Sequence, residues 1–222
     1  TRPDEIVNYL EFKSDRLYLV TTGADQADSL ISFDFIEQIK KIKRQNYSIK
    51  KENFTKALGL SKGMQGTILD TTCGTGKDAV LMAFLGLNVI SFERNPLIYA
   101  LLLDAHRRLK DDNQYGETAS RLTIVFGDAR LVSKDYIEKP EIIYCDPMYG
   151  DLKRKSLPRK EMQIFKELVG IDDDSLKLID WALKLAKKRV VIKRPKKATN
   201  LEPAPDHSFV GKSTRFDVYF LN

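Results

Sequence analysis

Cysteine is scarce in this chain, and long hydrophobic runs are missing. Two cysteines, Cys73 and Cys145, are too few among 222 residues for the disulfide framework of a small secreted protein. No stretch approaches the roughly 18 apolar residues of a membrane-spanning helix, so no membrane span is expected. The opening residues, "TRPDEIVNYL", lack the apolar core of a secretory signal peptide. These absences favour a cytoplasmic protein with reduced cysteines.

Acidic residues are in deficit. Lys and Arg number 37 against 31 Asp and Glu, which gives a formal net charge of +6. The surplus is uneven, with eight basic residues and one acid from Lys40 to Lys62, and fifteen basic residues against seven acids from Asp151 to Lys197. A basic surplus favours a polyanionic partner such as RNA, DNA or anionic lipid. A solvated charged face is the alternative explanation.

Hydrophobic residues make up 42% of the chain, enough for one sizeable core with a small annex. From Thr67 onward, strand-like and helix-like segments alternate, and a closing hairpin follows. This predicts an α/β fold: a doubly wound, Rossmann-like, mostly parallel sheet of seven strands with an antiparallel C-terminal hairpin. The expected strands are 67–70, 88–93, 121–128, 141–146, 189–195, 206–210 and 214–221, and the expected helices are 77–87, 95–112, 157–170 and 174–188.

The first sixty residues give weaker signals, with a strand expected at 16–22 and a basic helix within 31–45. We therefore divide the chain into a small N-terminal α+β extension, residues 1–62, and a main domain, residues 63–222. A further amphipathic helix is expected at 48–60, with an apolar face of Ile49, Phe54, Ala57 and Leu58. The residues of the last helix expected to face the core are Leu176, Ile179, Leu183 and Leu185.

A glycine-rich turn follows the first main-domain strand. In "LDTTCGTGKD" the strand ends at Asp70, and Gly74 and Gly76 precede a helix. Glycines let the backbone turn sharply and approach a ligand, and the amides at a helix N-terminus can face a polar group. The turn is not a G-x-G-x-x-G fingerprint, because Lys77 and Asp78 follow the second glycine. It is not a P-loop either, because the required G-x-x-x-x-G-K-[ST] spacing is absent. An ordinary structural turn explains the glycines equally well.

Acidic residues also end the second and third strands. Glu93 stands seventeen residues after the second glycine, where an acid can accept hydrogen bonds from both hydroxyls of a ribose. Asp128 could accept from an adenine amine while the Ala129 amide donates to a ring nitrogen. Open α/β sheets bind ligands at this edge. The alternatives are a helix-cap role for Glu93 and a loop-cap role for Asp128.

A nucleoside site without a pyrophosphate fingerprint indicates S-adenosylmethionine rather than NAD as the cofactor. Asp70, Thr72 and the rest of the glycine-rich turn would then face the methionine end, whose amino group is cationic. The histidines His106 and His207 are not needed as bases, and no metal site is predicted.

"IIYCDPMYGD" places Asp146, Pro147, Met148 and Tyr149 directly after the fourth strand. An Asp/Asn-Pro-Pro-aromatic sequence at this place resembles the motif of class I amino-methyltransferases, with Met148 in place of the second proline. The lone pair of an exocyclic amine is delocalised into its base and is a poor nucleophile. Asp146 and the Pro147 carbonyl can accept its two N–H groups and orient the lone pair, and Tyr149 can stack on the base. A strand-end turn with a buried tyrosine is the alternative.

Six segments together resemble one family, the bacterial 16S rRNA guanine-N2 methyltransferases of the small-subunit methyltransferase J type. The likeness runs from about Ile31 to Tyr219 and is carried by "LDTTCGTGKDA", "FERNP", "YCDPMY", "LPRKEMQIFKELVG", "KRVVIKRP" and "GKSTRFDVY". It implies a class I methyltransferase fold, S-adenosylmethionine as donor and the N2 of a guanosine near the 3′ end of 16S rRNA (position 1516 in the usual numbering) as acceptor. The cofactor contacts that it implies are Lys77, Asp78, Glu93, Arg94, Asp128, Ala129 and Asp146.

Basic residues beside the fourth and fifth strands are the candidates for contacts with RNA phosphates. They are Lys153, Arg154, Lys155, Arg159, Lys160, Lys193 and Arg194. The chain departs from the family before the "KALGL" segment, where "RQNYSIKKEN" is basic but lacks glycines. It also has Asp128-Ala129 where relatives often carry Ser-Ser, and Tyr149 where they often carry Phe.

Three other functions use the same pattern. A DNA adenine-N6 or cytosine-N4 methyltransferase also uses Asp-Pro-x-aromatic, but the 222 residues show no separate target-recognition domain. A non-catalytic RNA-binding protein of this fold would have no need of Asp146, Glu93 and the two glycines. A protein glutamine methyltransferase usually carries Asn at the position of Asp146.

Overall fold

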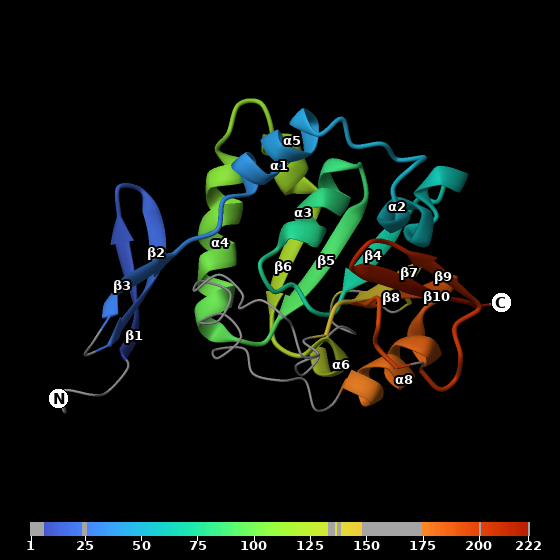
Figure 1. Cartoon of the computed structure of the whole chain (residues 1–222). Coiled ribbons are helices and arrows are strands. Elements are labelled where there is room, and N and C mark those ends of the chain that lie inside the picture. Colours follow the sequence, from blue (N-terminus) through green and yellow to red (C-terminus); the bar gives the residue numbers. More distant parts are fainter. Residues whose placement is uncertain are drawn as a thin grey trace.

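The computed structural model describes residues 7–23, 26–132, 136, 139–147, 175–199 and 201–221. Its centre is a seven-stranded sheet (Figure 1). The strands are β4 (Thr67–Asp70), β5 (Asn88–Glu93), β6 (Leu122–Phe126), β7 (Ile142–Cys145), β8 (Arg189–Pro195), β9 (His207–Val210) and β10 (Thr214–Phe220).

The strand order is β6-β5-β4-β7-β8-β10-β9. Strands β4 to β8 run parallel, and β10 pairs antiparallel with β8 and β9. The first strand of this sheet is β4, at its centre. The chain winds outward from it through β5 and β6 and then continues on the other side of β4 with β7, so the sheet is doubly wound. The predicted α/β fold with its closing antiparallel hairpin is confirmed.

Helices cover both faces of the sheet. They are α1 (Phe35–Arg44), α2 (Asn53–Leu58), α3 (Lys77–Phe84), α4 (Pro96–Lys110), α5 (Gly116–Ser120), α6 (Ala129–Val132) and α8 (Ser175–Leu185), with a 3-10 turn η1 (Leu60–Lys62). On one face, Ile68 and Val191 join a core with residues of α1 to α5. On the other, Leu69 and Val190 join a core with residues of α8. This alternation is typical of a parallel sheet that is buried on both sides.

The first part of the described chain forms a separate three-stranded antiparallel sheet, of which the sequence predicted the middle strand. Its strands are β1 (Val7–Lys13), β2 (Arg16–Gly23) and β3 (Gln26–Ile31). In Figure 1 this sheet lies outside α4, on the side away from the C-terminal hairpin. The buried side chains of Leu19 and Ile31 attach it to the main core.

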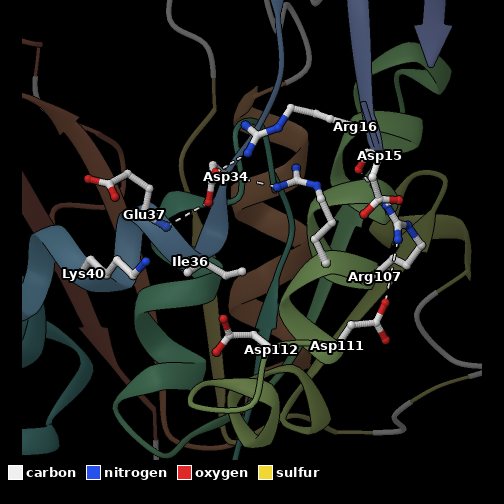
Figure 2. A pocket seen from close by; sticks show the side chains of 10 residues that line it. Asp15, Arg16, Asp34, Ile36, Glu37, Lys40, Arg107, Asp111 and Asp112 are labelled. Atoms are coloured by element: carbon white, nitrogen blue, oxygen red, sulfur yellow. Dashed lines mark hydrogen bonds and ion pairs between the residues drawn. The ribbon is translucent and has the colours of Figure 1, made fainter. Parts of the chain in front are cut away.

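Charged residues complete this attachment. Arg16 pairs with Asp34 at 2.6 Å, and Arg107 of α4 pairs with Asp15 at 3.0 Å. Figure 2 shows these side chains around a polar pocket of about 430 Å³. The pocket lies at the C-terminal end of α4. Glu93 and the other strand-end residues lie near the opposite, N-terminal end of that helix. Its lining mixes both signs of charge, which is typical of a packing interface.

Two helix faces differ from the prediction. Helix α2 covers only six residues, and it buries Phe54, Ala57 and Leu58 but leaves Ile49 outside the helix and 40% exposed. Helix α8 buries Leu178, Ile179 and Ala182, whereas Leu176 is 63% exposed, so the expectation for Leu176 was wrong. The buried positions of α8 have helical spacing, but one of them is Ala182, whose small side chain gives a weak hydrophobic signal in the sequence.

The expected helix at 157–170 lies outside the described residues. The boundary at residue 62 stays a prediction, although Phe35 of α1 and Leu58 of α2 share one core with strand β4. Among the helices that the structure describes, none has both the length and the apolar composition that crossing a bilayer requires.

Candidate active site

The predicted site residues gather where the parallel strands end. Asp70 is the last residue of β4, Glu93 the last of β5, and Asp128 and Asp146 follow β6 and β7 closely. Because β4 lies between β5 and β7, the turn after β4 reaches the ends of both neighbours. Its Thr71 donates through the backbone N–H and the hydroxyl to the Tyr144 carbonyl, at 3.0 and 3.1 Å.

The two glycines of the turn are needed for backbone geometry. Gly74 and Gly76 have φ of +56° and +71°, a region that side chains disfavour. A Cβ on Gly76 would also stand 2.6 Å from the ring of Phe35 and 2.8 Å from Leu102. The close approach at Gly76 therefore serves packing between α1 and the start of α3. The N–H groups of Thr72, Gly74 and Gly76 donate to acceptors within the protein, so their role toward a ligand stays a prediction.

Asp70 lies beneath this turn, with 1% of its surface exposed. Its carboxylate accepts from the Thr72 N–H at 3.1 Å and from the Ser91 hydroxyl at 2.6 Å. Burial raises the pKa of Asp70 to about 7, although these two bonds oppose the shift. In this arrangement Asp70 orders the turn from inside, and its predicted contact with the cofactor remains untested.

Glu93 joins the end of β5 to the same turn. It accepts from the Gly74 N–H at 3.0 Å and from the Asn95 N–H at 2.8 Å. Burial raises the pKa of Glu93, and the bonds to these backbone groups and the charge of Arg94 act in the opposite direction. The acid and the glycine turn are thus in contact, and the hydrogen bonds from ribose hydroxyls to Glu93 stay a prediction. Arg94 itself is exposed.

At the end of β6, Asp128 accepts from the Arg130 N–H at 2.9 Å and pairs with the Arg130 guanidinium. The hydrogen bond from that side chain, with its charge, lowers the pKa of Asp128. Ala129 is buried at the start of α6. The sequence did not single out Arg130, which keeps Asp128 ionised as the predicted acceptor for an adenine amine.

Asp146 is held from two sides. Its backbone N–H donates to the Thr72 hydroxyl oxygen at 2.7 Å, and the Lys193 ammonium donates to its Oδ2 at 2.9 Å. Lys193 also donates to Asp78 Oδ2 at 2.7 Å. Burial alone would lower the pKa of Lys193, but the two carboxylates outweigh it and the pKa is raised. Pro147 is buried next to Asp146.

Tyr144 is the residue of this group that sequence reasoning missed. Its hydroxyl donates to Asp78 Oδ2 at 2.6 Å from a ring that is fully buried in β7. Burial and the nearby carboxylates raise its pKa well above the ordinary value, so it acts as a donor. The available signal was a tyrosine inside the buried run "IIYC", because a buried hydroxyl needs a partner.

The two basic residues predicted at the end of β8 point to opposite faces. Lys193 faces α3, whereas Arg194 is 5% exposed and lies 3.5 Å from Asp217 on the other face. A contact of Arg194 with RNA would require it to leave Asp217. The other candidates, Tyr149, Lys153, Arg154, Lys155, Arg159 and Lys160, lie outside the described residues.

The donor groups of S-adenosylmethionine fit this edge of the sheet. A cationic amino group and two ribose hydroxyls need acceptors, and Asp78, Glu93 and Asp128 place carboxylates beside a turn of backbone N–H groups. Among the described residues, no group of three or more His, Cys, Asp or Glu side chains is arranged to hold a metal ion. The strand order, the glycine turn, the acid at the end of β5 and the Asp-Pro after β7 define a class I S-adenosylmethionine-dependent methyltransferase.

Comparison with known proteins defines the family. Residues 2–221 match the family described as "Putative SAM-dependent methyltransferase". The Ribosomal RNA small subunit methyltransferase J of Thioalkalivibrio sulfidiphilus is 38% identical over 206 residues, which cover 91% of this chain and 80% of that protein. The protein of the same name from Coxiella burnetii is 39% identical over 213 residues, or 96% and 83% of the two chains. The chain belongs to the ribosomal RNA small subunit methyltransferase J family, and its cofactor is S-adenosylmethionine.

A crystal structure supports the same assignment. The S-adenosylmethionine-dependent methyltransferase NGO1261 from Neisseria gonorrhoeae is 32% identical to this chain and superimposes with a TM-score of 0.75. The match covers 99% of this chain and 85% of that one, so it includes the three-stranded sheet as well as the main domain.

Proposed function

We propose that this protein methylates the exocyclic N2 amine of a guanosine in 16S ribosomal RNA. The names of its relatives support a ribosomal RNA substrate. Guanine N2 and its position rest on the family resemblance of the sequence. A ribosomal substrate would also place the protein in the cytoplasm.

The observation that carries the proposal is the placement of Asp146. Its side chain is 36% exposed at the end of β7, while its backbone and one carboxylate oxygen are fixed by Thr72 and Lys193. A carboxylate that is both fixed and reachable can accept an N–H of the target amine and hold its lone pair in line for transfer.

Bound S-adenosylmethionine supplies an electrophilic methyl group, and Asp78, Glu93 and Asp128 are the residues that would hold it. The protein's part is to bring a weak nucleophile into line. Asp146 accepts one N–H of the amine, and the Pro147 carbonyl is proposed to accept the other. Tyr149 is proposed to stack on the base. The methylated nitrogen then releases a proton readily, because its positive charge withdraws electrons from the remaining N–H bonds.

The basic surface supports an RNA partner. Helix α1 and the loop that follows it carry exposed lysines and arginine on the side away from the core: Lys40, Lys41, Lys43, Arg44, Lys50 and Lys51. Such residues can bind phosphates without reading sequence. These basic residues would raise affinity for rRNA, whereas base selection belongs to the edge of the sheet around Asp146.

The test offers labelled S-adenosylmethionine with three substrates: undermethylated 30S subunits, naked 16S rRNA and duplex DNA. We expect label in one or both rRNA substrates at guanine N2, and none in DNA. Label confined to DNA would overturn the proposal, as would a protein that binds the cofactor but labels nothing. Asp146→Ala should abolish transfer and leave the thermal unfolding profile close to that of the wild type.

A further inference from the structure

Lys193 lies between two carboxylates of the candidate site, an arrangement that the sequence alone does not predict. Its Nζ lies 2.7 Å from Asp78 Oδ2 and 2.9 Å from Asp146 Oδ2. The three side chains come from different elements, because Asp78 is in α3, Asp146 follows β7 and Lys193 is in β8. Each is only 27–36% exposed. A flexible lysine is thus fixed between one carboxylate of the predicted cofactor loop and one of the predicted acceptor site.

Asp78, the second partner of Lys193, is itself held in place by Tyr144. Tyr144 donates to the same Asp78 oxygen that Lys193 contacts, at 2.6 Å. The Tyr144 ring is fully buried and meets Phe54 edge-on, with ring centroids 5.6 Å apart. The Asp78 side chain is therefore held in one orientation, and its carboxylate in turn fixes the position of the Lys193 ammonium.

An ammonium ion is chemically suited to this position. The two Oδ2 atoms contact the same nitrogen, so they lie close to one another, and two negative charges at that separation repel. A cation between them offsets this repulsion. Only an ionised Asp146 accepts the N–H of an amine at either oxygen, whereas a protonated carboxyl also donates.

We propose that Lys193 is a positioning residue for methyl transfer, which fixes the Asp146 carboxylate for the target amine and links it to Asp78 at the start of α3. This inference rests on the proposed function, in which Asp146 receives the amine. It replaces the role in RNA binding that the sequence suggested for Lys193. Of the three N–H donors of its ammonium, two are already directed at carboxylates.

The test compares Lys193→Met, which keeps the length of the side chain without its charge, with Lys193→Arg, which keeps the charge. Lys196→Met is the matched control, because Lys196 is exposed just beyond the end of β8. For each protein we would measure kcat and KM for undermethylated 16S rRNA, and the Kd for that RNA at several salt concentrations.

We expect Lys193→Met to lower kcat on the order of 100-fold, the effect of misplacing a reacting group, with KM for RNA nearly unchanged. Lys193→Arg should recover part of the rate. The acid limb of the kcat profile should move to higher pH in Lys193→Met. Among the described residues, the groups near Asp146 besides Lys193 include Asp70, Tyr144 and Cys145, and Asp78 contacts the same ammonium; none of these four supplies a positive charge.

Binding of RNA separates this role from a phosphate contact. A lost phosphate contact would weaken RNA binding and reduce the slope of log Kd against log salt by roughly 0.7–0.9, while kcat at saturating RNA stayed near the wild-type value. That result would overturn the inference. If the wild type itself transfers no methyl group to rRNA, the proposed function fails. An active wild type with an equally active Lys193→Met refutes only the role of Lys193.

Discussion

The backbone N–H of Asp146 donates a hydrogen bond of 2.7 Å to the hydroxyl of Thr72. The two residues belong to loops that follow different strands, β4 and β7. This bond joins the loop that is predicted to hold the cofactor to the residue that is predicted to hold the acceptor. The relative position of the methyl donor and the acceptor therefore depends in part on one threonine hydroxyl.

Replacing Thr72 by Val should slow transfer. Valine has the shape of threonine but no acceptor, so the Asp146 N–H would lose its partner and the loop could shift. We expect kcat to fall roughly 10- to 100-fold, since small misplacements at a reacting centre have effects of this size. Thr72→Ser should restore most of the rate. Steady-state kinetics with undermethylated 16S rRNA would decide, and a Val variant with full kcat would contradict the role of this bond.

Replacing Glu93 by Gln should weaken cofactor binding. Both oxygens of Glu93 accept backbone N–H groups, and an amide would turn one acceptor into a donor facing an N–H. A charged hydrogen bond contributes about 1.5–3 kcal/mol, so we expect the Kd for S-adenosylmethionine to rise about 10-fold or more. Calorimetric titration measures it. Glu117→Gln is the control, because Glu117 is 78% exposed and pairs with Arg121 on the surface. Equal affinity in both variants would refute the ribose role.

Gly76→Ala should destabilise the fold more than Gly63→Ala. Both glycines have φ near +75°, at +71° and +77°, so both variants carry the same backbone penalty. Only at Gly76 would the new Cβ stand 2.6 Å from the Phe35 ring, whereas Gly63 has nothing within 4 Å. We expect about 1 kcal/mol of lost stability at Gly63 and an additional ~1–3 kcal/mol at Gly76 from overpacking. Urea unfolding of the two variants tests this, and equal losses would contradict it.

Asp70 should make stability fall as pH rises. Its pKa is about 7 in the folded protein against 3.8 ordinarily, so the folded state holds a proton that the unfolded state has lost. The stabilisation is complete below about pH 4 and is lost as the pH rises through 7, at up to about 1.4 kcal/mol per pH unit. Asn at this position can keep both hydrogen bonds without ionising. Urea unfolding from pH 4.5 to 8 would show the wild type losing stability relative to Asp70→Asn as the pH rises. A constant difference between the two proteins would exclude this shift.

Much of the site could be predicted because buried hydrophobic runs in the sequence show where each strand of a parallel sheet ends. Strand-end residues such as Glu93 and Asp146 follow buried runs, and all parallel strands end at one edge. The sequence therefore predicted which residues would meet, without the side-chain directions that decide what each one does. Asp70 was predicted to face the cofactor, yet both of its oxygens accept from groups inside the protein.

Long-range packing was the part that sequence could not supply. The contact of Phe35 with Gly76 joins residues from two predicted domains, and no local pattern announces it. The three-stranded sheet was largely missed because its outer strands expose apolar side chains, among them Phe12 at 62% and Leu30 at 53%. A strand with exposed apolar residues does not show the alternation by which strands are recognised.

Lys193 and Arg194 point to opposite faces of the sheet and have different partners, so the order of these two residues in the chain affects the structure even though both carry the same charge. A protein with the two letters exchanged would have the same composition and the same isoelectric point. It would nevertheless insert a planar guanidinium between Asp78 and Asp146, and it would leave Asp217 facing a shorter, more strongly hydrated ammonium. The two basic residues are therefore not interchangeable, and a sequence comparison that scores them as equivalent would overlook a change of ion pairs on both faces of the sheet.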